Sequence, residues 1–406
     1  MWWRQPLSSW LRLGGRDMLD SRWAAARSVL LVRLDNIGDV VLLSAAVRAI
    51  RENLPQARLT LLASPAGSQG AALLPGLDEV LAWRAVWQDL GHLPLDPSRE
   101  MALVELLKFR RFDAAIVFTS FSQSPHGAAY ACYLAGIPLR LGESKEFGGT
   151  LLSTEVRGLP DHLYQAERNL RLIEAVGFAV GDRKPHVAPG QRAVERARVL
   201  LASRGIWPGQ PYVVVHPGAS CQARRYPLVR FAVVARLLPR ATGLPVVVTG
   251  AGKDAAEMDA VTCRSAQVTS IAGLTSVEEL AAVVAGARLV VCNDSLPMHL
   301  AAALGVPAVV TFSGTDLESQ WVSPYVPTAV LRRETKCSPC YLMECPYRLE
   351  CLDIPPREVV DRAVDLLSSP RTLGSTDCDP NHEPGLEAGQ RNDVPTMPDL
   401  RPGEVS

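Results

Sequence analysis

Short apolar runs alternate with amphipathic stretches along most of the chain. In the first half, residues 28–34, 59–63 and 114–119 read as buried strands. Between the first two lies an amphipathic pattern that predicts a helix from about Val40 to Asn53. Strand, helix and strand at this spacing are typical of βαβ units, so we expect a parallel sheet.

The same alternation starts again after a charged stretch, residues 181–204, which itself contains an expected helix. The apolar runs that predict strands in this second half are residues 212–215, 245–249, 268–271, 289–291 and 308–312. Helices are expected from about Leu228 and over residues 276–285. The pattern therefore predicts an α/β fold of two Rossmann-like, doubly wound domains, residues 28–185 and 186–368, that face each other across a cleft.

The two ends of the chain depart from this pattern. Residues 1–27 are basic and tryptophan-rich but lack the apolar core of a signal peptide. They read either as a helix lying on a membrane face or as an extension partly packed on the body. Residues 369–406 are rich in proline, glycine and acidic side chains, which is typical of a disordered tail.

The composition narrows the choice of partners. A hydrophobic share of 48% and a charged share of 21% are those of an ordinary globular protein. The formal net charge is zero, so no nucleic-acid partner is expected and any anion site must be local. No apolar run approaches the roughly 20 residues that span a bilayer. We expect a cytoplasmic protein, with peripheral contact to the inner face of the cell membrane as one option.

Polar side chains stand where predicted strands end and helices begin. Asn293, Asp294 and Ser295 follow one strand and open an Ala/Leu-rich helix that stops at Gly305. Such a junction gathers backbone N–H donors and the positive end of a helix dipole, so it favours phosphate-bearing ligands. Asp39 stands at the same kind of junction after the first strand. Helix capping is the alternative role for these residues.

Gly250 and Gly252 follow another predicted strand in a G-x-G-x-x-A pattern. The pattern suggests a dinucleotide site, but the acidic residue expected about 20 positions later is absent. We interpret the turn as facing a nucleotide, with Asp254 or Glu257 as a ribose contact. A solvated helix start explains these two acids equally well.

Four cysteines are grouped near the end of the second half: Cys337, Cys340, Cys345 and Cys351. Four thiolates can hold a structural zinc ion, and the first pair has metal-ligand spacing. The second pair does not, so free or paired thiols are the other interpretation.

Three motifs together carry a family likeness. They are residues 33–39 (Arg-Leu-Asp-Asn-Ile-Gly-Asp), residues 216–227 with His-Pro-Gly-Ala-Ser and Arg-Arg-Tyr-Pro, and residues 293–305, which begin Asn-Asp-Ser-Leu-Pro-Met-His. In this order and spacing the chain resembles the ADP-heptose:lipopolysaccharide heptosyltransferases, family 9 glycosyltransferases of the GT-B fold. The resemblance implies transfer of a heptose-like sugar from an ADP-sugar to a lipopolysaccharide-like or other cell-surface saccharide. It also implies inversion at the anomeric carbon, with no metal or other cofactor required.

The resemblance implies roles for residues in the first two motifs. Asp39 matches the general base, and Gly38 the turn glycine that lets substrate approach; a carboxylate can take the proton of an attacking hydroxyl. Ser220 and Arg224 match positions that contact the donor phosphates, and the cation there is usually lysine. Arg225 is a second candidate for the same contact, or else an exposed charge ahead of a helix.

In the third motif, Asp294, Ser295 and His299 match the donor-site acid, hydroxyl and histidine of the family. Two positions depart from the pattern. Ala219 stands where a second hydroxyl is common, and Leu296 stands where glycine lets the backbone approach phosphate closely.

Two other functions stay open on these residues. The departures at Ala219 and Leu296 fit a non-catalytic sugar-nucleotide binder, and the glycine turn fits a nucleotide-dependent oxidoreductase. For a transferase, acceptor recognition is expected in the first half, around residues 120–130 and 140–145, where His126 and Lys145 are available.

Overall fold

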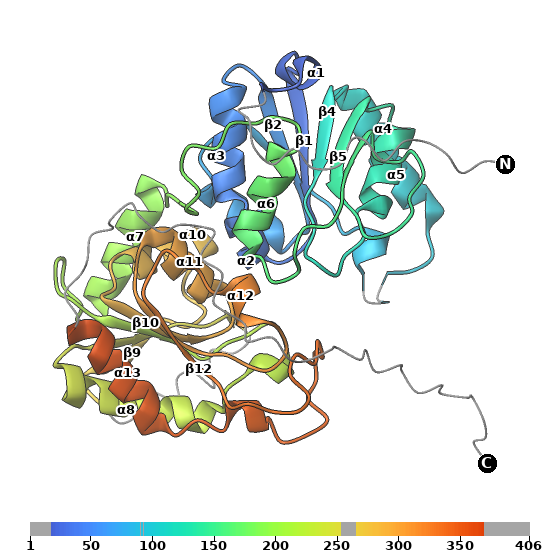
Figure 1. Cartoon of the computed structure of the whole chain (residues 1–406). Coiled ribbons are helices and arrows are strands. Elements are labelled where there is room, and N and C mark those ends of the chain that lie inside the picture. The colour runs from blue at the N-terminus through green and yellow to red at the C-terminus, as the bar shows by residue number, and fades with distance from the viewer. Residues whose placement is uncertain (1–17, 90, 92, 253–264, 369–406) are drawn as a thin grey trace. The chain divides into compact units, whose positions relative to one another are not determined.

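The chain forms two six-stranded parallel sheets, one after the other in the sequence (Figure 1). The strand order is β3-β2-β1-β4-β5-β6 in the first sheet and β12-β11-β10-β7-β8-β9 in the second. This computed structural model describes residues 18–89, 91, 93–252 and 265–368. Asp254, Glu257, residues 1–17 and the predicted tail lie outside the described residues.

The strands of the first sheet are β1 Ser28–Arg33, β2 Arg58–Ala63, β3 Glu79–Ala82, β4 Ala114–Val117, β5 Leu139–Glu143 and β6 Thr154–Val156. Those of the second sheet are β7 Val213–His216, β8 Val246–Val248, β9 Val268–Ser270, β10 Leu289–Asn293, β11 Ala308–Thr311 and β12 Thr328–Leu331. Every predicted strand is present. The pattern missed β3, β6 and β12, which are half-exposed edge strands, and β5, whose run is interrupted by Arg140 and Gly142.

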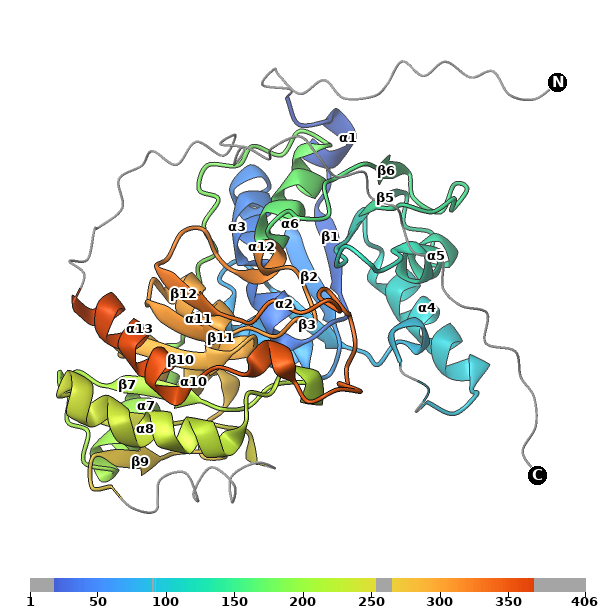
Figure 2. The ribbon, with the colours of Figure 1, turned by 60° about the horizontal axis from the view of Figure 1, so that its bottom comes forward.

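Helices connect the strands on both faces of each sheet (Figures 1 and 2). They are α1 Ser21–Ala24, α2 Ile37–Val41, α3 Ser44–Asn53, α4 Pro97–Arg110, α5 His126–Leu134, α6 Gln165–Glu174, α7 Gln191–Ser203, α8 Leu228–Thr242, α10 Val277–Ala285, α11 Leu296–Leu304, α12 Glu318–Trp321 and α13 Pro356–Ser368. Short 3-10 turns are η1 Gly67–Leu73, η2 Val86–Gln88, η3 Gln222–Arg224 and η5 Glu350–Leu352. The single helix expected over residues 40–53 was wrong. It is divided into α2 and α3 at Leu42 and Leu43, which are both fully buried at the break.

Alternate residues of the strands pack against different helix layers. In β1, Val29 and Leu31 join the apolar core under α3 and α6, whereas Leu30 and Val32 join the core under α4 and α5. In the second sheet, the helices α8 and α13 lie side by side on one face (Figures 1 and 2). Burying a side chain of this size contributes about 1.5–3 kcal/mol, so near-continuous apolar strands are what a sheet covered on both faces requires.

The described part of the N-terminal extension packs on the first half. Trp23, in α1, is fully buried, and its ring meets Phe178 edge-on with centroids 6.0 Å apart. For residues 18–27 this fits the interpretation of an extension packed on the body. Within the described ranges, no helix is long and apolar enough to cross a membrane.

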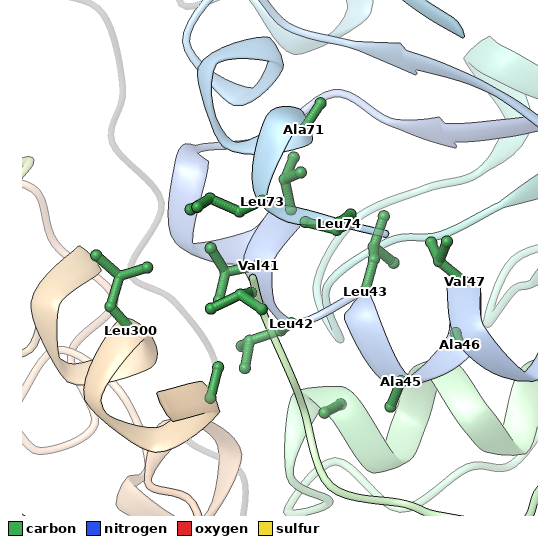
Figure 3. Close-up of a cluster of buried hydrophobic side chains, with 14 of the residues drawn as sticks. Val41, Leu42, Leu43, Ala45, Ala46, Val47, Ala71, Leu73, Leu74 and Leu300 are labelled. Atoms are coloured by element: carbon green, nitrogen blue, oxygen red, sulfur yellow. The ribbon is translucent and has the colours of Figure 1, made fainter. Parts of the chain in front are cut away.

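One apolar cluster contains side chains from both halves of the chain. Figure 3 shows Leu300 of α11 beside Val41 and Leu42 at the end of α2, and all three are fully buried. The helices α2 and α11 are therefore in contact. These are the helices that carry Asp39 and His299.

Candidate active site

The strand order reverses at one position in each sheet. In the first sheet β1 lies between β2 and β4, and in the second β7 lies between β8 and β10. Open parallel sheets bind ligands beyond the carboxyl ends of the strands at such a switch point. Asp39 follows β1, Arg224 follows β7 and Asp294 follows β10. The predicted base Asp39 and two of the predicted donor residues, Arg224 and Asp294, thus follow strands at the two switch points.

Asp39 lies in the first turn of α2, with its side chain mostly buried. Its Oδ1 accepts a hydrogen bond from Arg33 Nη2 at 2.8 Å, and its Oδ2 accepts one from the Asn36 backbone N–H at 3.2 Å. The capping interaction foreseen as an alternative role is therefore present. It leaves acceptor capacity free, because a carboxylate offers about four lone-pair sites.

Arg33 organises the surroundings of Asp39. Its guanidinium is fully buried, with Nε 2.8 Å from Asp35 Oδ2 and Nη2 donating to Ser120 Oγ at 2.9 Å. Burial raises the pKa of the Asp35 carboxyl, the Arg33 charge opposes this, and the Asp39 charge adds to it. A buried cation needs such partners. The sequence analysis gave Arg33 no role, although an arginine inside an apolar strand, with two aspartates close behind it, is a signal for a buried ion-pair network.

Gly38 serves close packing rather than a turn. It lies inside α2 without a left-handed backbone, and a Cβ on it would stand 2.6 Å from His299 Cδ2. His299 is buried on α11, and its ring centroid is 6.0 Å from that of Trp321. Burial lowers the pKa of His299 to about 4, so the ring is neutral at neutral pH. His299 therefore packs against the helix that presents Asp39.

We expect Gly38→Ala to lower both stability and turnover. The added methyl group has to push His299 or α2 aside, and overpacking of this kind costs about 1–3 kcal/mol. Gly181→Ala is the matched control, because nothing lies within 4 Å of a Cβ there and its φ is not positive. Chemical denaturation and steady-state kinetics measure both effects. Equal stability and turnover of the two variants would contradict the packing role.

Arg224 is surrounded by acceptors on the second half. Its Nη2 is 2.5 Å from Asp316 Oδ2, its Nε donates to Thr315 Oγ1 at 3.2 Å, and the same Nε is 3.5 Å from Asp294 Oδ2. Burial opposes its charge, but the carboxylates of Asp294 and Asp316 raise the pKa of Arg224. The structure brings two of the predicted donor residues, Arg224 and Asp294, close together. It adds Thr315 and Asp316, which the sequence analysis missed although they follow a predicted strand.

Asp294 is buried at the end of β10. Its Oδ2 has no hydrogen-bond partner among the residues that the structure describes. Burial raises the pKa of Asp294 to about 6; the Arg224 charge lowers it, and the charges of Asp316 and Asp39 raise it further. An unpartnered buried acceptor of this kind is expected where a ligand supplies the missing donor, such as a sugar hydroxyl.

The other residues of the third motif have structural contacts. Asn293 is buried and ties the loop after β7 to β10: its Nδ2 donates to Pro217 O at 2.6 Å, and its Oδ1 accepts from the Tyr226 N–H at 3.0 Å. Ser295 is the residue before α11, partly exposed, with Oγ 3.3 Å from Asn293 O. Leu296 is partly buried and packs against the apolar core. The Leu296 side chain, which departs from the family pattern, is thus accommodated by packing against the apolar core.

The remaining predicted donor residues are spread along the same edge of the sheet. Ser220 is exposed in the loop after β7, and Arg225 holds that loop by donating from Nε and Nη2 to Ala219 O at 3.2 and 3.1 Å. Gly250 and Gly252 follow β8, where Gly250 O accepts from the Gly273 N–H at 2.9 Å. No hydrogen bond or ion pair joins these four described residues to the side chains of Arg224 or Asp294.

The four clustered cysteines are free thiols in the structure, and in the described part of the chain no group of three or more His, Cys, Asp or Glu is arranged to hold a metal ion. The zinc interpretation therefore has no support here. Their segment packs against the loop after β11 instead, with the Cys340 and Tyr341 N–H groups donating to Gly314 O and Thr315 O at 2.9 and 2.8 Å.

A small hollow of about 160 Å³ lies in the first half. Its lining comes from the loops after β4 and β5 and from one later residue: Phe121, Ser122, Gln123, Ser124, Ser144, Lys145, Glu146 and Asp161. Lys145 pairs with Asp161 and lies over the Phe121 ring, 5.6 Å from its centroid. Gln123 Oε1 accepts from the Ser120 N–H at 2.9 Å, and Ser120 also contacts Arg33. This hydrogen-bonded chain connects the hollow to the residues around Asp39.

The comparison with protein families decides what the chain is. A family model described as glycosyltransferase family 9 (heptosyltransferase) matches residues 101–350. The chain belongs to glycosyltransferase family 9. Lipopolysaccharide heptosyltransferase 2 of Escherichia coli K12 is 26% identical to it over 301 residues, which are 70% of this chain and 82% of that protein.

Solved structures agree on the fold of this family 9 glycosyltransferase. The family 9 glycosyl transferase of Veillonella parvula aligns with a TM-score of 0.69 and 19% identity, over 87% of this chain and 99% of that one. The E. coli heptosyltransferase WaaC, solved with ADP-2-deoxy-2-fluoro heptose, aligns with a TM-score of 0.61 and 17% identity, over 83% and 99%. The predicted two-sheet GT-B fold is confirmed.

Family membership also settles the choice between enzyme classes. The oxidoreductase alternative was wrong: the glycine turn after β8 belongs to a glycosyltransferase. The non-catalytic alternative loses one of its reasons, because Leu296 packs into the core.

Proposed function

We propose that this glycosyltransferase moves a heptose-like sugar from an ADP-sugar to a lipopolysaccharide-like saccharide on the cytoplasmic side of the membrane, with inversion and without a catalytic metal. The observation that carries the proposal is the placement of a carboxylate, Asp39, and a cation, Arg224, at the switch points of the two sheets. The E. coli relative is named lipopolysaccharide heptosyltransferase 2, and the structural neighbour WaaC was solved with ADP-2-deoxy-2-fluoro heptose.

In the proposed reaction an acceptor hydroxyl attacks the anomeric carbon of the donor. A bond forms between the acceptor oxygen and that carbon, and the bond from the carbon to the phosphate oxygen breaks. The hydroxyl proton passes to the Asp39 carboxylate, and ADP leaves with the electron pair. A single displacement of this kind inverts the anomeric centre.

Asp39 is suited to take the proton because its position is fixed. Arg33 and the Asn36 N–H hold one lone pair on each carboxylate oxygen, and the side chain remains 12% exposed. A base held at hydrogen-bond distance from its substrate contributes about 10²–10⁴-fold to the rate. Orientation and stabilisation of the leaving group supply the rest.

The leaving diphosphate needs positive charge and hydrogen-bond donors. Arg224 offers a guanidinium that can engage two phosphate oxygens at once. Thr315 and Ser220 offer hydroxyls, and the start of α11 offers the Leu296 N–H, because Pro297 has no N–H and the Met298 N–H donates to Ser295 O at 3.0 Å. Asp294 Oδ2, which accepts no hydrogen bond from the described residues and lies 3.5 Å from Arg224 Nε, suits a hydroxyl of the sugar. These groups supply the electrostatic stabilisation that a divalent cation supplies in other transferases.

The acceptor fits the first half. The hollow beside Phe121 carries hydroxyl, amide and carboxylate groups, which suit the hydroxyls of a saccharide, and it lies beyond the ends of β4 and β5 in the same sheet as Asp39. Ser144 and Lys145 are part of its lining, and His126 Nε2 lies 2.9 Å from Ser144 Oγ. This agrees with the expected acceptor region around residues 120–130 and 140–145.

A nucleotide panel followed by turnover tests the proposal. ADP and ADP-heptose are expected to raise the thermal midpoint, because a ligand at 100 times its Kd stabilises a fold by about 2.7 kcal/mol. UDP and NADH serve as comparisons and should shift the midpoint less. With a lipopolysaccharide-core acceptor, ADP release is expected to continue in EDTA and to give the inverted anomer by NMR. Stabilisation by UDP alone, loss of turnover in EDTA, or a retained anomer would overturn the corresponding part of the proposal.

A further inference from the structure

Arg224 has anionic partners within the protein itself. Asp316 Oδ2 is 2.5 Å from its Nη2, and Asp294 Oδ2 is 3.5 Å from its Nε. The side chains of Asp294 and Asp316 are 2% and 9% exposed. One cation therefore faces two buried carboxylates at the position where the proposed function needs a diphosphate. The excess negative charge here repels an incoming anion unless one of the two carboxylates moves away from Arg224.

Asp316 is the carboxylate that is free to give way. Asp294 directly follows β10, which is paired with both β7 and β11. Asp316 instead belongs to the loop between β11 and α12. The backbone of this loop is anchored at Gly314 O and Thr315 O by the N–H groups of Cys340 and Tyr341. Release of Arg224 therefore requires only a change of side-chain rotamer at Asp316, which is fast and leaves the loop in place.

The rotamer change at Asp316 also affects the Thr315 hydroxyl, which contacts both Asp316 and Arg224. Thr315 Oγ1 is 2.7 Å from Asp316 Oδ2, accepts from Arg224 Nε at 3.2 Å, and is 2.9 Å from Ser313 Oγ. When Asp316 turns away, the Thr315 hydroxyl is left beside the guanidinium. A hydroxyl and a guanidinium side by side form a binding surface for phosphate oxygens.

We propose that Asp316 is a positioning residue of the donor site: it holds the Arg224 guanidinium in the empty enzyme and yields its place to the donor diphosphate. This rests on the proposed function, because it assumes that the diphosphate binds at Arg224. The exchange keeps a partly buried cation, 26% exposed, paired at every stage, with a carboxylate first and a phosphate afterwards. It also makes donor binding a competition, so ADP is held less tightly and leaves more readily than Arg224 alone would allow.

Asp316→Asn tests the competition. The variant keeps the shape of the side chain and removes its charge, so we expect the Kd for ADP, measured by calorimetry, to fall about tenfold, which corresponds to about 1.4 kcal/mol. Donor KM is expected to fall together with kcat, because ADP leaves more slowly. A merely structural role would leave KM unchanged or raise it. Asp353→Asn is the matched control: Asp353 pairs with Arg230 at 2.6 Å on the surface and should not change ADP binding.

The same change in an Arg224→Met background shows whether the effect acts through Arg224. Asp316→Asn is expected to tighten ADP binding more in the wild-type background than in Arg224→Met, where only the direct repulsion between Asp316 and the diphosphate is relieved, with thermal midpoints confirming that each variant folds. An equal gain in both backgrounds, or ADP binding in Asp316→Asn that is unchanged or weaker, would overturn the inference alone. Failure of the wild-type enzyme to bind ADP would instead overturn the proposed donor site, and this inference with it.

Discussion

Replacing Asp39 with asparagine is expected to lower kcat by about 10²–10⁴-fold while leaving the affinity for ADP nearly unchanged. The amide cannot take the proton of the attacking hydroxyl, but it keeps the size of the carboxylate and an oxygen that can accept from Arg33 or the Asn36 N–H. The loss therefore falls on the chemical step rather than on donor binding. Steady-state kinetics with ADP-sugar and acceptor, together with calorimetry for ADP, separate the two quantities.

Asp113→Asn is the control for this prediction. Asp113 accepts from the Arg27 and Ser28 N–H groups at 2.8 and 2.9 Å, at the opposite end of β1 from Asp39. Asp113 is a capping carboxylate next to the same sheet but away from the switch point. The kcat of Asp113→Asn is therefore expected to match that of the wild type. If Asp39→Asn retained wild-type turnover, or lost ADP binding to the same extent as turnover, Asp39 would not be the base.

The positions of Asp39 and Asp294 could be predicted from the sequence, because each follows from the local pattern of apolar and polar residues. Each stands where a buried apolar strand gives way to a helix, and in a doubly wound sheet those junctions at the switch point face the ligand. The apolar runs were long enough to identify the central strands. The edge strands β3, β6 and β12 escaped because they are short and half-exposed, so no continuous apolar run marks them.

The sequence analysis missed the partners of the site residues for a different reason. Arg224 and Asp316 are 92 residues apart, and Arg33 and Ser120 are 87 apart. Nothing in the spacing of such residues reveals that they meet, because the contact exists only after β4 has paired with β1, or after β10 and β11 have paired beside β7. The packing of Gly38 against His299 is of the same kind. The motif includes Gly38, but the structure explains why: a side chain there would collide with His299, which lies on a helix of the other half.

Replacing Arg224 with methionine is expected to lower kcat/KM for the donor by about 10²–10³-fold, the usual effect of removing one group that stabilises developing charge. Methionine keeps much of the length of the side chain but leaves Asp294 and Asp316 facing the diphosphate without a cation. Donor KM is expected to rise and kcat to fall, since the phosphates are bound in the ground state and gain charge as the sugar departs. Arg224→Lys is expected to recover part of the loss, because lysine restores the charge but not the bidentate geometry.

A fall in activity of Arg224→Met also arises if two unpaired buried carboxylates loosen the fold, since breaking a buried ion pair is strongly destabilising. Two further variants separate these causes. Arg224→Met/Asp316→Asn removes one charge of each sign, so the fold is expected to recover while donor binding stays weak. Arg230→Met removes an arginine that pairs with Asp353 on the surface, and its donor KM is expected to equal that of the wild type. A donor KM that is unchanged in a well-folded Arg224→Met variant would show that the diphosphate binds elsewhere.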